Sequence, residues 1–173
     1  SALAGTTSGA GAFGEDAGED MLSLRKALFE LSQRAEIAAF DIKRQYAFLA
    51  QDTVERYFDI LIGAYLLNPL KSDYDLETIA SEHLGMMIPG RAETFGKLSD
   101  GQAAGSMPEA FAKYCCYGAY VSRRAAVVLE DKLKKTGMDR LYREIEMPLS
   151  LVLYDMEKEG VEVRREELKS YVS

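Results

Sequence analysis

Asp41 is the first residue whose surroundings suggest chemistry, because it follows directly on a short apolar segment, residues 36–40 (EIAAF), that is predicted to be a buried strand. A carboxylate at the end of a strand lies at the edge of a sheet, where its oxygens can bind a hard cation such as Mg²⁺. A hydrolytic metal site would need a second acidic group one turn further on, and the sequence has an amide there, Gln45. The segment therefore has the layout of a metal-dependent hydrolytic site in which one ligand position is neutral.

The other candidates for chemistry have simpler structural interpretations. Asp41 and Asp59 are predicted to be strand-end or helix-capping residues. Tyr114, Tyr117 and Tyr120 could form a platform on which bases stack, but their spacing of three favours a half-buried stripe along one helix.

Cysteine, histidine and arginine add little evidence for catalysis. The adjacent Cys115 and Cys116 point in different directions on a helix, so we expect free, core or half-buried thiols in a reducing cytosol. His83, the single histidine, is expected at the surface or at a helix end. Arg123 and Arg124 are the candidate DNA-contacting residues, although a solvated helix face with cations near its C-terminus explains them as well.

Length, composition and charge set limits on the class of protein. The chain has 173 residues, 47% hydrophobic and 28% charged, which is typical of one soluble domain or of one domain with a piece of a second. Its net charge of −7 predicts weak DNA binding by this chain alone, because phosphate contacts dominate nucleic-acid affinity. No apolar run reaches the roughly 20 residues that span a membrane, and no signal peptide is visible. We therefore expect a cytoplasmic protein without a membrane partner.

Apolar spacing and turn residues predict the elements that must position these side chains. The first half alternates helices and strands, and the second half is nearly all helix, which indicates the α/β class. The expected elements are a mobile or edge-strand segment over residues 1–18, a helix from residue 19, strands at 36–40 and 54–59, helices at 43–51, 60–67 and 72–84 (the last capped by Ser72 or Asp75 and ended by Gly85), a loop or insert over 86–107, a helix over 108–135, and a helix over 138–159 that Pro148 kinks or restarts.

Two stretches resemble family A DNA polymerases, the family of bacterial DNA polymerase I. Residues 142–171 resemble the segment that joins the exonuclease-like domain to the polymerase domain. Residues 38–49 and 58–69 resemble the strands and helices around the second exonuclease motif, and residues 73–85 continue them. The junction features present here are Glu146, Pro148, Leu149, Met156, Glu157, Gly160 and Val161.

This resemblance implies an α/β, ribonuclease-H-like 3′→5′ exonuclease fold, with a small mixed sheet, over residues 19–136. Residues 137–173 would be a helical junction and the first elements of the polymerase domain. The palm and fingers motifs are not in this sequence, so the chain is expected to be a fragment of a longer polymerase that reaches DNA through the rest of that chain. Mg²⁺ is expected for the parent polymerase, and no cofactor or stable small-molecule ligand for the fragment.

The resemblance also indicates where the family's metal-binding carboxylates would stand. The first forty residues hold no D-x-E motif on a plausible strand. Aligning Lys43 with the family's lysine puts Gln45 at one metal-binding aspartate, and the simplest alignment of the late motif puts Tyr114 at the catalytic tyrosine and Gly118 at a second aspartate. No acidic residue lies between positions 109 and 130, so we expect a degenerate, inactive site.

Two alternatives stay open at this point. The first is an active exonuclease that uses Asp41, Asp59 or acidic residues upstream, because the register of the second motif could slip and make Asp41 the ligand. The second is a purely helical interaction module unrelated to polymerases.

Overall fold

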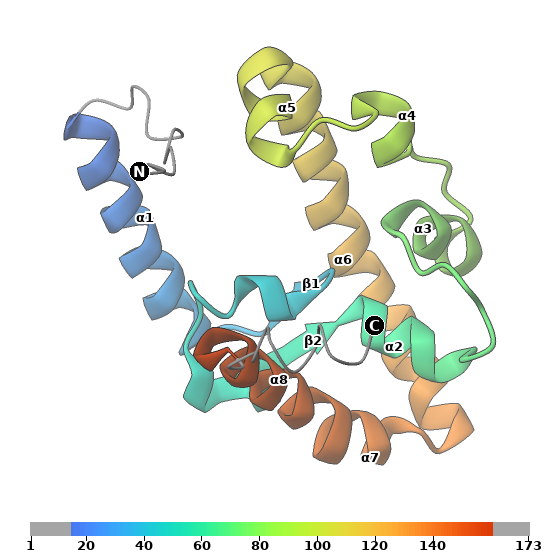
Figure 1. The fold of residues 1–173 in the computed structure, drawn as a ribbon. Helices are drawn as coiled ribbons and strands as arrows, with labels where there is room; N and C mark the ends of the chain where they lie inside the picture. Colours follow the sequence, from blue (N-terminus) through green and yellow to red (C-terminus); the bar gives the residue numbers. More distant parts are fainter. Residues whose placement is uncertain (1–14, 161–173) are drawn as a thin grey trace, which may run out of the picture.

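The structure of the protein is a computed structural model that describes the backbone of residues 15–160 and the side chains of residues 21–160. Most of this part is helical, and two short strands lie near its centre (Figure 1). The elements are α1 (Glu15–Ser32), β1 (Ile37–Ala39), the 3₁₀ helices η1 (Ile42–Gln45) and η2 (Gln51–Arg56), β2 (Tyr57–Asp59), α2 (Ile60–Leu67), α3 (Leu76–Leu84), α4 (Arg91–Phe95), α5 (Asp100–Ser106), α6 (Pro108–Thr136), α7 (Asp139–Leu141), the π-helical turn η3 (Tyr142–Glu146) and α8 (Met147–Glu159).

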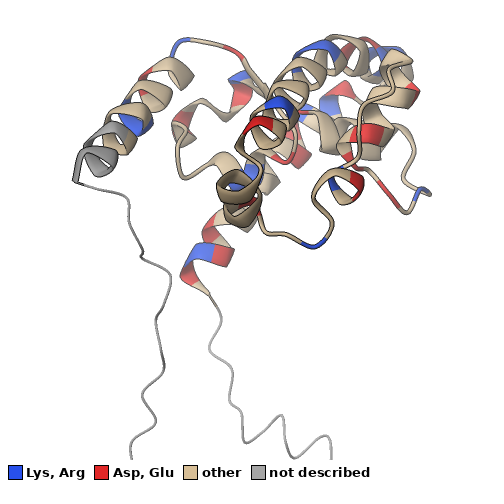
Figure 2. Cartoon of the chain, turned by 90° about the horizontal axis from the view of Figure 1, so that it is seen from above, with Lys and Arg blue, Asp and Glu red and all other residues tan. Residues whose placement is uncertain are grey.

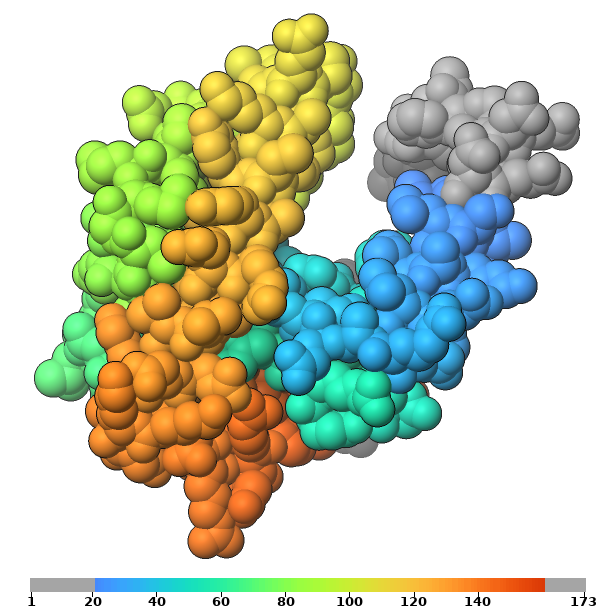
Figure 3. Space-filling model, turned by 180° about the vertical axis from the view of Figure 1, so that it is seen from behind, coloured from blue at the N-terminus to red at the C-terminus, as the bar shows by residue number. Residues whose placement is uncertain are grey.

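Helix α1 begins earlier than the sequence indicated. It starts at Glu15, so the predicted mobile or edge-strand segment over residues 1–18 is wrong for residues 15–18, and residues 1–14 lie outside the described part. Acidic residues in a first turn favour a helix N-terminus, which accounts for the earlier start. The helix is tied to the body at its other end, where Ser32 Oγ accepts a hydrogen bond of 2.8 Å from the Ala50 N–H. From behind, α1 stands apart from α5 and the first half of α6 (Figure 3).

The two strands form a parallel pair in which Ile37 lies opposite Tyr57 and Ala39 lies opposite Asp59. The described part contains no antiparallel strand, so the expected mixed sheet is replaced there by this parallel pair. A parallel pair needs a crossover connection, and here η1 and η2 supply it.

The α-helix predicted over residues 43–51 is wrong, because tertiary contacts replace helical hydrogen bonds in this segment. Asp41, just before η1, takes the left-handed conformation with φ of 53°. Tyr46 and Ala50 are buried, and the Ala50 carbonyl accepts a hydrogen bond of 2.5 Å from the Tyr57 hydroxyl. Side-chain burial and this bond fix the backbone in short 3₁₀ turns.

Helix α6 organises the core by crossing β1, α2 and α3 (Figure 1). Its start at Pro108 and its end before Gly137, which has φ of 73°, agree with the predicted boundaries. The residues that it buries recur at helical spacing, namely Val121, Ser122, Ala125, Ala126, Leu129 and Leu133. This periodicity explains why the helix could be predicted from the sequence.

Residues 86–107, predicted to be a loop or insert, contain two short helices, α4 and α5. The sequence signals that indicate these two helices are local and weak. Ser99 and Gln102 form a reciprocal capping box at the start of α5, and the Phe95 side chain at the end of α4 is only 4% exposed.

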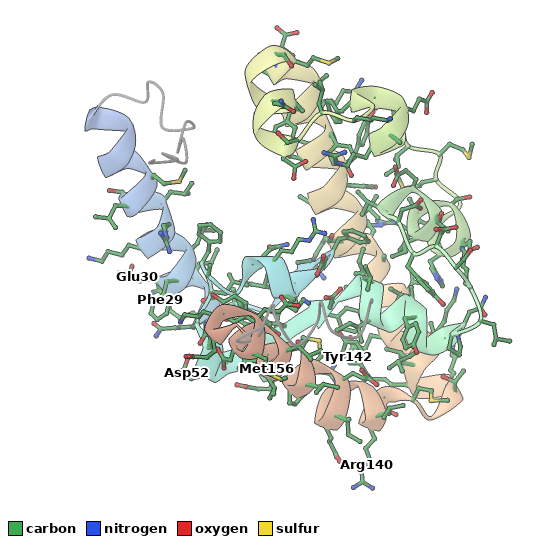
Figure 4. The ribbon with its side chains drawn as sticks, viewed as in Figure 1. Phe29, Glu30, Asp52, Arg140, Tyr142 and Met156 are labelled. Carbon is green, nitrogen blue, oxygen red and sulfur yellow. The ribbon has the colours of Figure 1, made fainter. Side chains whose placement is uncertain are left out.

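The predicted disturbance at Pro148 is confirmed as a π-helical turn, η3, directly before α8. Proline lacks an N–H and crowds the carbonyl four residues earlier, which favours such an irregular turn. Tyr142 of this turn lies inside the molecule, whereas Arg140 points outward (Figure 4). Tyr142 and Met147 belong to the main core, and the domain boundary at residue 137 stays a prediction. The strand-like VEV segment falls outside the described residues.

Candidate active-site hollow

A hollow of about 540 Å³ gathers the main site residues expected from the sequence. It lies between the end of β1, η1, the start of α3, the insert with α4 and α5, and the first half of α6. Its lining includes Asp41, Gln45 and Tyr114. Gly118 follows Tyr114 by one helical turn, and a Cβ atom built on it would lie 3.8 Å from Leu76 Cδ2, another atom of the lining residues. Asp41, Gln45 and Tyr114 therefore share one hollow, and Gly118 lies next to one of its lining side chains.

The acidic side chains that line this hollow already have partners. Asp75 Oδ1 accepts a hydrogen bond of 2.8 Å from the Thr78 N–H and caps α3, as predicted. Glu77 Oε1 accepts one of 2.5 Å from the Arg91 N–H at the start of α4. Asp100 Oδ1 lies 2.7 Å from Arg91 Nη2. Glu77 thereby links the insert of residues 86–107 to α3, and the pair of Asp100 with Arg91 links α4 to α5 within the insert.

Asp41 and Gln45 make local contacts. Asp41 Oδ2 lies 2.7 Å from Arg44 Nε in an ion pair. Asp41 lies just after β1 and at the N-cap position of η1, as predicted, but its side chain accepts no capping hydrogen bond and its backbone is left-handed. Gln45 Nε2 donates to the Phe40 carbonyl at 3.4 Å.

These donors do not fit a pair of Mg²⁺ ions. Two-metal hydrolysis needs several carboxylates that converge on ions a few ångströms apart. Within residues 21–160, no three His, Cys, Asp or Glu side chains are placed so that they could share a metal ion. At the two positions that the resemblance assigns to metal-binding aspartates, the chain has the amide of Gln45 and the bare Cα of Gly118.

Tyr114 packs against the insert. Its ring meets the Phe95 ring edge-on, with centroids 5.6 Å apart. Burial and the nearby Glu77 carboxylate raise the pKa of its hydroxyl. Tyr114 and Tyr117 are half-buried as predicted, whereas Tyr120 is 51% exposed.

The cysteine and arginine predictions come out differently. Cys115 and Cys116 are free thiols as expected, but both are exposed, so the prediction of buried or half-buried thiols is wrong. They lie on the first half of α6, and Cys115 lines the hollow next to Tyr114. Arg123 and Arg124 are exposed on the second half of α6, outside the hollow. Basic and acidic residues are interspersed along the helices (Figure 2), and DNA contact by these arginines stays a prediction.

Asp59 is the buried carboxylate that connects the elements around the hollow. Its side chain is 2% exposed. Oδ1 accepts hydrogen bonds from the Asp41 N–H at 3.2 Å and the Leu61 N–H at 2.9 Å, and Oδ2 accepts one from the Ile42 N–H at 2.8 Å. The predicted cap of α2 is thereby confirmed. The sequence did not reveal the contacts to Asp41 and Ile42, because they depend on the parallel pairing of the strands.

Tyr142 completes this connection from the C-terminal side. Its hydroxyl accepts a hydrogen bond of 2.7 Å from the Asp59 N–H and donates one of 3.2 Å to the Asp59 carbonyl. Its ring stacks on Phe58 with centroids 4.7 Å apart. One residue therefore joins β1, β2, α2 and the turn before α8, and a buried carboxylate engaged in this way is not available to a metal.

The burial of Asp59 predicts a specific pH dependence. Burial raises its pKa from 3.8 to about 6, against the opposing effect of the backbone hydrogen bonds. Between these values the unfolded chain loses the proton and the folded chain keeps it, so this carboxyl contributes less to stability as the pH rises. We expect the stability advantage of the wild type over Asp59→Asn to shrink by about 2–3 kcal/mol between about pH 4 and pH 7, measured by urea unfolding. An advantage that stays constant across this range contradicts the assignment.

Comparisons of the sequence with known proteins point to one family. The family described as DNA polymerase I, ribonuclease H-like domain, matches residues 17–128. DNA polymerase I of Geobacillus stearothermophilus is 30% identical over 139 residues, which cover 75% of this chain and 15% of that protein. DNA polymerase I of Bacillus subtilis (strain 168) is 28% identical over 133 residues, with the same shares covered. That of Borreliella burgdorferi is 33% identical over 113 residues, or 65% of this chain and 12% of that protein.

Two further findings complete the comparison. No solved structure gives a significant match to the chain. Among the described helices, none combines the length and apolar character required to span a bilayer.

Proposed function

The chain belongs to the DNA polymerase I family through its ribonuclease H-like, 3′→5′ exonuclease-like domain, and on this premise we propose that the domain is catalytically inactive and supports the polymerase architecturally. The chain spans about 15% of the length of the first two curated relatives. The parent protein would be a DNA-directed polymerase acting in bacterial replication or repair, in the cytoplasm and near the nucleoid. DNA and Mg²⁺ would be bound by the remainder of that protein.

The hollow carries the proposal of inactivity. It places Asp41, Gln45 and Tyr114 together, which supports one location for the site that the resemblance implies. Its ligand positions hold an amide and a glycine, and its other carboxylates serve helix starts and the ion pair with Arg91. Loss of the carboxylates removes the negative charge that would hold two divalent cations.

The segment that follows Asp41 supports an architectural role, because its side chains contact α8. The Tyr46 hydroxyl lies 2.7 Å from Ser150 Oγ. The Tyr46 ring meets that of Tyr154 at a centroid distance of 5.6 Å. Lys43 Nζ lies 2.5 Å from Glu157 Oε1. The residues that follow Asp41 therefore hold the junction helix that leads toward the polymerase domain.

The outer side of α8 offers a surface for the rest of the polymerase. Five apolar side chains are exposed at helical spacing along η3 and α8, namely Ile145, Leu149, Val152, Leu153 and Met156, with exposures between 42% and 60%. Exposed apolar stripes of this kind commonly mark interfaces. Because about 85% of the matched relatives lies outside the region that this chain covers, we propose that the remainder of the parent chain packs on this stripe.

Charge placed on this stripe tests the architectural role. In the full polymerase, Leu149→Asp combined with Val152→Asp should make the junction at least tenfold more sensitive to limited proteolysis, because the domains no longer pack. In the 173-residue chain alone, the same variant should change the free energy of unfolding by less than about 0.5 kcal/mol, since both side chains are exposed. The matched control is Lys158→Asp, at an exposed polar position of α8. Unchanged proteolysis of the double variant would contradict the architectural role.

A further inference from the structure

A second hollow, of about 360 Å³, lies between α2, α3 and the C-terminal end of α6. It shares no lining residue with the hollow that contains Asp41 and Tyr114. Apolar side chains form its wall, including Leu67 and Ile79, and lysines stand at its rim. Apolar pockets of this size with a few converging polar groups are typical of small-molecule sites.

The rim of this hollow is positive on an acidic protein. Lys71, Lys132 and Lys135 line it together with one acid, Glu82. With His83 neutral, the hollow is lined by three positive charges and one negative charge, and Asp131, the ion-pair partner of Lys135, lowers the local net charge to +1 on a chain whose net charge is −7. An anion would balance this local excess.

Lys132 is the cation whose contact is unusual. Lys71 pairs with Glu82, and Lys135 Nζ lies 2.6 Å from Asp131 Oδ2. Lys132 Nζ instead lies 2.9 Å from His83 Nδ1. Within the described residues no carboxylate oxygen comes within 4.0 Å of the Lys132 ammonium.

The contact fixes the state of the imidazole. An ammonium can only donate hydrogen bonds, so His83 Nδ1 must accept and the ring is neutral. Burial first, and then the charges of Lys132 and Lys71, lower the pKa of His83, while Glu82 opposes them. The ring and the ammonium are thus two potential donors held side by side with no anion between them.

Attraction of cations to helix C-termini does not account for the contact between Lys132 and His83. Cations near a helix end interact with its last carbonyls, and here other groups bond those carbonyls. The Tyr74 hydroxyl donates to the Asn68 carbonyl after α2. Thr136 Oγ1 donates to the carbonyls of Lys132 and Leu133 at 2.9 and 3.2 Å. The Lys132 ammonium is directed at an imidazole instead.

We propose that this hollow binds a phosphate monoester carried on a small apolar or aromatic body, with Lys132 and His83 donating to the phosphate oxygens. The apolar wall near Leu67 and Ile79 would contact the body of the ligand. Binding places the anion beside both donors and favours protonation of His83, so a bound anion raises the pKa of this imidazole. The ligand could be a free small molecule or the terminal phosphate of a nucleic acid. A site of this kind departs from the expectation that the chain takes no small-molecule ligand.

His83 is the only histidine in the chain, so its imidazole proton resonances report on this site alone. Phenyl phosphate should shift them saturably at pH 7, whereas sodium chloride at equal ionic strength should not. Sulfate, a dianion throughout the range, should raise the pKa of His83 by at least half a unit. Lys132→Gln should weaken phenyl phosphate binding at least tenfold, and Lys132→Arg should restore it to within about threefold of the wild type.

The matched control is Lys134→Gln, on the same helix but outside the hollow, which should leave binding unchanged. A shift that sodium chloride reproduces, or one equally strong in Lys132→Gln, overturns the proposal. Short oligothymidylates with and without a 5′ phosphate distinguish the source of the ligand. A phosphate-dependent shift identifies a nucleic-acid end, and a response to phenyl phosphate alone identifies a small molecule.

Discussion

Replacing Asp59 with alanine should lower the free energy of unfolding of the chain by about 3 kcal/mol at neutral pH. The side chain accepts three backbone hydrogen bonds at a position that is 2% exposed. Alanine leaves the N–H groups of Asp41, Ile42 and Leu61 without this acceptor. Each hydrogen bond to a charged group contributes about 1.5–3 kcal/mol, and losses within one network are not additive.

Asp75→Ala is the matched control for this prediction. Asp75 also caps a helix, but through one hydrogen bond to Thr78 at an exposed site. Its removal should cost about 1 kcal/mol. Urea unfolding of both variants at pH 7 gives the comparison. Equal losses for the two would mean that Asp59 is an ordinary cap and that its carboxylate does not hold the Asp41–Ile42 backbone against β2 and α2.

Aspartates at the two positions that the resemblance assigns to metal ligands should create a metal site in the hollow. Gln45→Asp combined with Gly118→Asp would place two new carboxylates near Asp41. The position of Gly118 has room, because its built Cβ meets only Leu76 Cδ2, at 3.8 Å. Three carboxylates provide the oxygen ligands that Mn²⁺ and Mg²⁺ prefer. We expect the double variant to bind Mn²⁺ at least a hundredfold more tightly than the wild type.

Calorimetric titration with Mn²⁺ measures this gain. The control variant Gln51→Asp with Gly105→Asp adds the same charge outside the hollow, and the built Cβ of Gly105 also meets open space. It should bind Mn²⁺ as weakly as the wild type. If the two double variants bind equally, or if the wild type already binds tightly, the hollow does not have the degenerate ligand set inferred for it.

Local signals predicted much of the fold. Pro108 and Gly137 bound α6, Asp75 and Gly85 bound α3, and Asp59 caps α2, as their residue types indicated. Each signal acts within one turn of its helix. The 3₁₀ turns after Asp41 were missed because burial of Tyr46 and Ala50, and contacts with residues distant in sequence, outweigh helix propensity there.

Part of the candidate site could also be predicted from the sequence. The resemblance singled out Asp41, Gln45 and Tyr114, and in the structure all three line one hollow. The role of Arg91 could not be predicted from the sequence. It depends on contacts with Glu77 and Asp100 across an insert whose helices have few apolar residues. The hollow around His83 was also missed, since three helices that are separate in sequence form it.

Metal-dependent trimming of a single-stranded oligonucleotide from its 3′ end is the measurement that tests the central claim most directly. The 173-residue chain and the full polymerase are each incubated with Mg²⁺ or Mn²⁺, with and without Asp41→Ala. The proposed inactive site predicts no trimming by the chain, and no change in the full polymerase when Asp41 is replaced. Trimming that requires the metal and disappears in Asp41→Ala would contradict it and establish an active exonuclease.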